Sequence, residues 1–226
     1  SEHLRDITFR HFYLRAPYPA DHFTGIDNDT YRSYLRDLIV DSPDYSKLTS
    51  DQQYLHDFGS VVGPVLSAYR FRQRIPRLKT RTGHVTASSI LEESCKQLAM
   101  EAYHFKERLK LAGESAAAIT TVQQNKTMIK LVMSRIIRKY SAANTRLLKY
   151  RNFVVHGPRN RRDEFSELRS WEMYGLLLHE DLWLDYNREF DIARDDWTSI
   201  AKDLISSMEA ACFAMQTLNE NAIASS

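Results

Sequence analysis

Residues Ser115–His156 read SAAAITTVQQNKTMIKLVMSRIIRKYSAANTRLLKYRNFVVH and contain neither Gly nor Pro. Apolar side chains recur in this run every three or four residues, which places them on one face of an α-helix. A single helix over all 42 residues would be about 63 Å long, so we expect a break near Gln123–Asn125 or near Ser141–Asn144. Gly157-Pro158 then ends the helical run. The apolar stripe consists of Ile129, Val132, Ile136, Tyr140, Ala143, Leu147, Tyr150 and Val154.

Further helices are expected on the N-terminal side of this run. One begins near Ser50, and Gly63-Pro64 kinks or ends it, with Pro64 suited to the first turn of a second helix that reaches Arg74. A stripe of apolar residues from Ile90 to Leu109 predicts another helix. We expect it to end at Gly113, because glycine commonly follows the last residue of a helix.

The C-terminal third of the chain has a mixed pattern. Asp163–Leu178 is compatible with a helix, whereas Leu176–Tyr186 is ambiguous and compatible with a short extended segment. A last amphipathic run from Ile200 to Leu218 is expected to be capped by Asp195 or Thr198.

These patterns predict an all-α fold, an antiparallel helical bundle of four or five long helices with an irregular N-terminal extension. The extension, residues 1–80, carries three of the six prolines in its first 50 residues and is expected to hold helices packed on the bundle, one of them at Asp29–Val40. Residues 81–226 are expected to form the bundle itself. The chain has only seven glycines, which argues against phosphate-binding glycine loops and against strand-rich folds.

Cysteine content and hydropathy indicate a cytoplasmic protein. Cys95 and Cys212 are too few for a disulfide framework and too far apart for a metal knuckle, so we expect both to be reduced core residues. No targeting segment and no run of 18 apolar residues is present, so no membrane contact is expected. The eight histidines form no metal-binding spacing, and we expect neither a metal nor a cofactor.

Charge is distributed unevenly along the chain, although the net charge is only +2. Residues 115–162 contain eleven Lys and Arg and no acid, whereas residues 163–203 contain twelve acids against four bases. We expect the acidic segment to fold back on the basic one and neutralise part of it, with its three tryptophans in core or interface packing. Arginines that stay in a loop would be free to bind phosphates of a polyanion.

A polar motif ends the longest run: Tyr150-Arg-Asn-Phe-Val-Val-His156-Gly-Pro158. Arg151 and His156 with four residues between them, and Asn152 after the arginine, resemble the R-x(4-6)-H signature of HEPN-family proteins, which are helical bundles. The resemblance covers these nine residues and, loosely, the helices from Thr86 to Leu218.

The resemblance implies a metal-independent endoribonuclease, such as a toxin or defence component, with the motifs of two protomers meeting at a homodimer interface. RNA would be the substrate, and an antitoxin protein would be a further partner. His156 would act as general acid or base, Arg151 would stabilise the phosphorane-like charge, and Asn152 would orient His156 or the phosphate. The basic residues expected to bind RNA are Lys149, Arg159, Arg161 and Arg162.

Residues i and i+5 lie about 140° apart on a helix, so Arg151 and His156 do not share a face. Three arrangements would still bring the two side chains together. The last turn of the helix unwinds, the long arginine side chain curls round the helix, or Arg151 of one chain lies beside His156 of another. An alternative role for both residues is capping of the helix end. The alternative function is a non-catalytic HEPN-like module that binds or scaffolds a protein or nucleotide partner.

Overall fold

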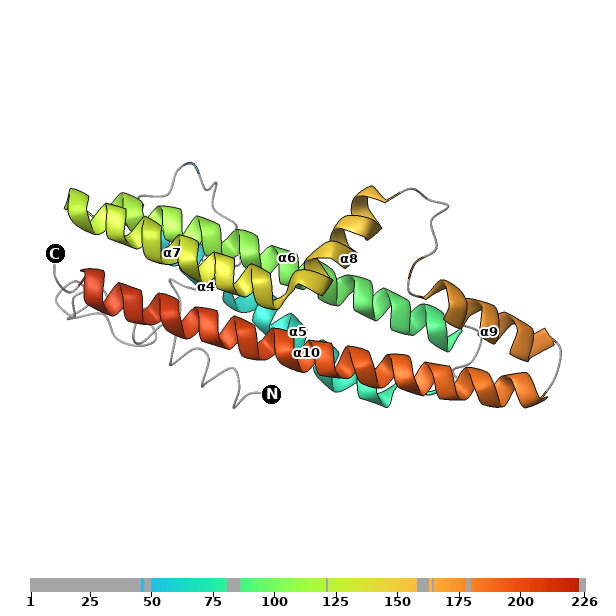
Figure 1. Ribbon diagram of the computed structural model, residues 1–226. Helices are drawn as coiled ribbons and strands as arrows, with labels where there is room; N and C mark the ends of the chain where they lie inside the picture. The colour runs from blue at the N-terminus through green and yellow to red at the C-terminus, as the bar shows by residue number, and fades with distance from the viewer. Residues whose placement is uncertain are drawn as a thin grey trace. The chain divides into compact units, whose positions relative to one another are not determined.

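The structure, a computed structural model, describes residues 46, 50–80, 86–120, 122–157, 163, 165–177 and 180–223. These residues form helices, with no strand among them (Figure 1). The predicted all-α helical bundle is therefore confirmed. The helix expected at Asp29–Val40 lies outside the described residues.

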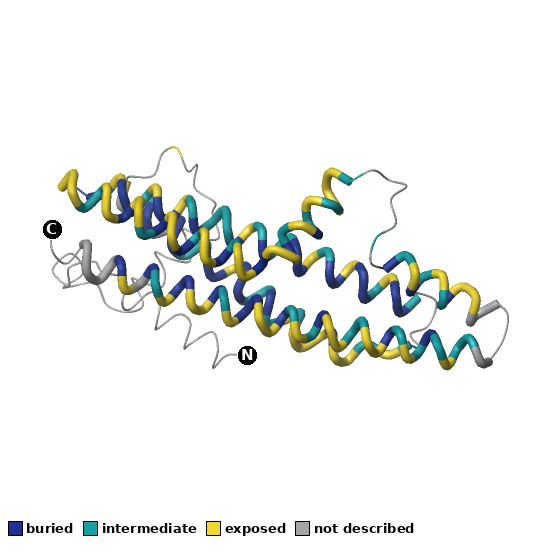
Figure 2. The backbone as a smooth tube through the Cα atoms, in the orientation of Figure 1, coloured by how far each residue is buried: buried dark blue, intermediate teal, exposed yellow. Residues whose placement is uncertain are grey.

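Three of the described helices are long, with 33, 21 and 44 residues, and the remaining α-helices have 11 to 13. Each has a buried and an exposed side, as Figure 2 shows along the tube. The bounds are α4 Ser50–Ser60, α5 Val62–Arg74, the 3₁₀ turn Ile75–Arg77, α6 Ala87–Ile119, α7 Gln123–Ala143, α8 Thr145–His156, α9 Ser166–Leu177 and α10 Glu180–Ile223.

The contacts group the chain into two compact units. The first contains the described parts of residues 1–63, 105–140 and 209–226, and the second contains those of 64–104 and 141–208. Helices α6 and α10 each contribute residues to both units. The expected division into residues 1–80 and 81–226 remains a prediction.

In the first unit, α6 and α7 pack antiparallel. The ring of Phe105 lies 4.9 Å from that of Tyr140, and further along the pair Gly113 faces Met133. The expected helix end at Gly113 is wrong, because α6 continues to Ile119. Gly113 is buried against α7, and a Cβ there would lie 3.0 Å from Met133 Cγ, so this glycine serves close helix packing.

Both of the breaks considered in the long run are present. The first separates α6 from α7 just before Gln123, and the second is a turn at Asn144 between α7 and α8. The buried Asn144 amide donates a hydrogen bond to Ser207 Oγ at 2.7 Å. Helix α5 begins after the break at Val61 with Pro64 in its first turn, as predicted.

Helix α10 corrects two further expectations. The segment 176–186, for which the sequence is ambiguous and compatible with a short extended stretch, is helical at 176–177 and from Glu180 onward. Asp195 and Thr198 do not cap a helix but lie inside α10, where Thr198 Oγ1 donates to the Arg194 carbonyl at 2.8 Å. The helix begins earlier because buried Tyr186 and Phe190 extend the apolar stripe toward the N-terminus.

Both cysteines are buried, as expected. Burial, with a smaller contribution from the charge of Glu209, raises the pKa of the Cys212 thiol to about 12, so this thiol is not a nucleophile. None of the described helices has the length and hydropathy needed to cross a membrane.

Replacing Gly113 by Val tests the close packing of α6 and α7. Valine adds a few tenths of a kcal/mol of helix propensity, but overpacking against Met133 costs about 1–3 kcal/mol, so the free energy of unfolding in urea should fall. Met133→Ala removes the clash, and the double variant should be more stable than the two single effects predict. Additive effects would contradict this packing.

Candidate functional site

Helix α8 is anchored through its buried aromatic side. The Tyr150 ring lies 5.4 Å from Trp197 of α10 in an edge-on arrangement, and Phe165, just before α9, stacks on the same indole at 5.9 Å. Such pairs contribute about 0.5–1.5 kcal/mol each beyond their buried area. The cluster fixes α8 at Tyr150, one residue before the polar motif, and confirms the core role expected for Trp197.

Arg151 and His156 meet within one chain. Arg151 Nη1 lies 3.4 Å from His156 Nε2 and donates to Asn152 Oδ1 at 3.1 Å. The last turn of α8 does not unwind, because the Gly157 N–H still donates to the Phe153 carbonyl at 2.8 Å. The arginine side chain therefore spans the angle between positions i and i+5.

The contact between Arg151 and His156 requires one protonation state of the His156 ring. A guanidinium only donates hydrogen bonds, so the Arg151–His156 contact is a hydrogen bond only when Nε2 carries no proton. In that state the lone pair of Nε2 is directed at the Arg151 guanidinium, and Nδ1 carries the ring proton. A phosphate that binds the guanidinium would release this lone pair, and Nε2 could then accept a proton close to the phosphate.

Tyr103 of α6 holds the guanidinium from the other side. Arg151 Cζ lies 3.9 Å from the centre of the Tyr103 ring, a stacked cation–π geometry. Arg151 Nε is buried and has no hydrogen-bond partner among the described residues, and the aromatic face of Tyr103 fixes the plane of the guanidinium. Sequence reasoning missed Tyr103, because nothing in the apolar stripe of α6 marks the residue that reaches α8.

The polar end of α8 is open to solvent. Asn152 and His156 are exposed and Arg151 is half-buried, while Val154 and Val155 beside them are 37% and 46% exposed. Figure 1 shows the end of α8 directed away from α10. The Val154 position expected in the apolar stripe is therefore not buried.

Of the four residues expected to bind RNA, only Lys149 is described. It is exposed on α8, two residues before Arg151, and no ion pair of its ammonium is seen in the described part of the chain. The other three, Arg159, Arg161 and Arg162, lie outside the described residues.

Glycine is required where α8 ends. A Cβ on Gly157 would collide with the Phe153 carbonyl oxygen, and this is the oxygen that accepts the last hydrogen bond of the helix. Gly157 then leaves the helix with extended backbone, φ −69° and ψ 152°. The helix therefore ends directly after His156.

The start of α9 is fixed by a polar cluster. Asp163 Oδ1 accepts hydrogen bonds from the Phe165 N–H at 3.0 Å and from Ser166 Oγ at 2.9 Å. The Arg169 guanidinium binds Asp163 at 3.1 Å and also pairs with Glu92 of α6. The cluster ties α9 to α6.

Neutralisation of the basic segment is partial, as expected. Arg146 of α8 pairs with Asp196 of α10 at 2.7 Å, with its guanidinium 5.5 Å from the Trp197 ring centre. Within α10, Arg188 and Arg194 pair with acids of their own helix. The acids of α10 are therefore partly occupied by local cations.

A hollow of about 500 Å³ lies along α9. Its lining includes two carboxylates and the partly exposed aromatic rings of Trp171 and Tyr174. None of the residues predicted for the site lines it, and its acids disfavour a phosphate ligand. The full lining is Asp163, Ser166, Glu167, Ser170, Trp171 and Tyr174.

Comparison with family models, with curated proteins and with solved structures finds no match to this chain. In the described residues, no group of three or more His, Cys, Asp and Glu is arranged to hold a metal ion. The chemistry available to the site is therefore that of Arg151, Asn152, His156 and Tyr103.

The contact with Tyr103 predicts a spectroscopic signature for Arg151. In ¹⁵N NMR spectra its Nε–H signal should be shifted upfield by the ring and exchange slowly with water, since Nε is buried. Tyr103→Phe keeps the aromatic face and should retain the shift, whereas Tyr103→Leu should abolish it. An unchanged signal in a folded Tyr103→Leu protein would refute the contact.

Asp163 should contribute stability that is lost in acid. Partial burial raises the pKa of this carboxyl, but hydrogen bonds from Ser166 and Arg169, the charge of Arg169 and the Phe165 N–H lower it more. The net pKa lies below its ordinary value, so the contribution is present above the unfolded pKa of about 3.9 and is lost as pH falls through the lower folded pKa.

Asp163→Asn should therefore be less stable than wild type at pH 7 and should show a shallower loss of stability below about pH 4. Chemical unfolding at several pH values measures both effects. Asp195→Asn, at a carboxylate with 71% of its side chain exposed, is the matched control and should follow wild type. Parallel curves for wild type and Asp163→Asn would contradict the prediction.

Proposed function

We propose that this chain is a HEPN-like, metal-independent endoribonuclease, with Arg151, Asn152 and His156 as its catalytic residues. The single observation that carries the proposal is the 3.4 Å approach of Arg151 Nη1 to His156 Nε2 at the exposed end of α8. A proton-exchanging imidazole and a permanent cation that lie this close can act on one phosphodiester.

In the proposed reaction, the phosphate draws the Arg151 guanidinium away from His156 Nε2, and the unprotonated nitrogen takes the proton of a ribose 2′-hydroxyl. The 2′-oxygen bonds to the adjacent phosphorus, and the bond from phosphorus to the 5′-oxygen breaks. The leaving 5′-oxygen receives a proton from a protonated His156 of a second protomer, and a 2′,3′-cyclic phosphate remains. Arg151 stabilises the charge on the pentavalent phosphorus oxygens, and Asn152 orients the guanidinium to which it is hydrogen-bonded.

The proposed reaction requires a dimer, because a second protomer supplies the protonated His156. Val154 and Val155 beside the motif are exposed apolar side chains, which suits burial against a second copy. As a toxin or defence component in the cytoplasm, the protein would be held inactive by an antitoxin. A monomeric mass in solution would contradict the dimeric arrangement.

The second candidate function is a non-catalytic HEPN-like module that binds a protein or nucleotide partner. The observation in its favour is that Arg151 Nη1 already interacts with Asn152 and His156. In this role, the same contacts stabilise the helix end and shape a binding surface. This candidate predicts binding that survives His156→Ala and no cleavage.

Incubation of the purified protein with RNA in EDTA separates the two functions. Wild type should cut the RNA and leave 2′,3′-cyclic phosphate ends, which mass spectrometry identifies. His156→Ala should lose about 10²–10⁴-fold in rate, the usual contribution of a general acid or base. Arg151→Lys should also be impaired, since lysine lacks the planar pair of donors.

His104→Ala is the matched control. This histidine is exposed on α6, and among the described residues its charge partner is Glu101, at 3.9 Å. The control should cut at the wild-type rate. No cleavage by wild type, or equal cleavage by wild type and His156→Ala, would overturn the catalytic assignment.

A further inference from the structure

The cations of α7 have no acidic neighbour in the sequence, which sets this helix apart from its neighbours. Within α6 and α10, Lys96, Lys110, Arg188 and Arg194 each pair with an acid of their own helix. Helix α7 contains no acid, and none occurs in residues 115–162. Local pairing is therefore not available to the cations of α7.

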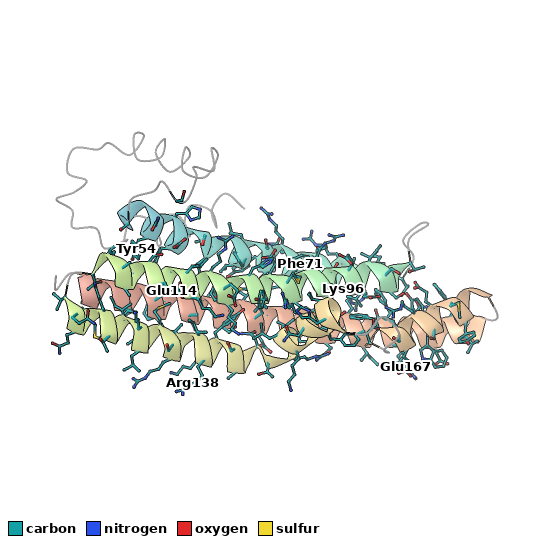
Figure 3. The ribbon with its side chains drawn as sticks, turned by 90° about the horizontal axis from the view of Figure 1, so that it is seen from above. Tyr54, Phe71, Lys96, Glu114, Arg138 and Glu167 are labelled. Carbon is teal, nitrogen blue, oxygen red and sulfur yellow. The ribbon has the colours of Figure 1, made fainter. Side chains whose placement is uncertain are left out.

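Four cations of α7 are exposed: Lys130, Arg135, Arg138 and Lys139. We call these four residues the α7 basic surface. In the described part of the chain, none of the four makes an ion pair. Figure 3 shows Arg138 on the side of α7 that faces away from α6. The packing of the first unit therefore leaves these charges in solvent.

The spacing of these charges is unfavourable in the isolated protein. Arg135, Arg138 and Lys139 stand at i, i+3 and i+4, within one helical turn, where like charges repel by about 0.2–0.5 kcal/mol per pair. Four cations that make no ion pair with the described residues also raise the local concentration of anions. An external polyanion would relieve the repulsion and release counterions.

We infer that the α7 basic surface binds the phosphate backbone of single-stranded RNA. The choice of RNA rests on the proposed function, because a ribonuclease must hold its strand beyond the scissile phosphate. The charge complementarity rests on α7 alone. Exposed Leu131, 52% accessible, and Met128, 38% accessible, lie among the cations and offer apolar contacts to bases.

The test is salt-dependent binding of a fluorescein-labelled, 20-nucleotide single-stranded RNA of mixed sequence, measured by anisotropy. All proteins carry His156→Ala, so cleavage does not interfere. The quadruple variant Lys130→Gln, Arg135→Gln, Arg138→Gln, Lys139→Gln should bind at least about tenfold more weakly at low salt. Each lost phosphate contact lowers the slope of log K against log salt by about 0.7.

The matched control replaces Lys96, Lys110, Arg188 and Arg194 by Gln and so changes the net charge equally. These four cations are paired with acids, and the control should keep most of the affinity and the slope. Helical circular dichroism and thermal unfolding verify that each variant is folded. An unchanged slope in the α7 variant, or an equal loss in the control, would overturn the inference.

Two further readouts separate the remaining explanations. Vesicles containing an anionic phospholipid test the membrane surface as the alternative polyanion, and loss of vesicle binding without loss of RNA binding would overturn the inference. RNA cleavage is measured separately, with proteins that keep His156. An uncut RNA whose binding still depends on the α7 basic surface would refute the nuclease and leave the inference standing.

Discussion

The packing of Tyr150 against Trp197 is the contact on which the candidate site depends. It turns one side of α8 into the core, so that the next residue, Arg151, is directed toward Tyr103 of α6. The exposed end of the helix then carries Asn152 and His156. Because the anchor and the motif are adjacent in sequence, a change in the register of α8 would move all three polar residues together.

The arginine is held by two different kinds of contact. The aromatic face of Tyr103 fixes the plane of the guanidinium without using its hydrogen atoms. Nη1 is then directed at Asn152 and His156. A side chain as long as arginine loses considerable rotamer entropy when it is ordered, so a prepositioned guanidinium would lower the entropic cost of binding a phosphate.

The fold was predictable where apolar spacing was regular. The helical run, its breaks at both suggested places and the helix end at Gly157 followed from periodicity and from Gly-Pro punctuation. The expected helix end at Gly113 was wrong because a glycine can either end a helix or allow another helix to approach closely. The sequence near Gly113 does not show which applies, since the answer depends on its packing partner Met133. Asp195 and Thr198 resembled caps because local sequence does not reveal that Tyr186 and Phe190 already belong to the same helix.

The residues of the candidate site could be predicted from the sequence motif, but the arrangement of their side chains could not. Helix angles alone place Arg151 and His156 on different faces, and the side-chain reach that closes the gap depends on Tyr103, a residue of another helix. A contact between residues 48 positions apart leaves no trace in the spacing of either segment.

The most direct measurement is an NMR titration of the full chain with a 2′-O-methyl RNA dinucleotide, which cannot be cut. The signals of the Arg151 guanidinium and of the His156 ring are followed together. If both groups bind one phosphodiester, both signals shift along curves that give the same Kd. A shift of only one signal, or two different Kd values, would contradict the account.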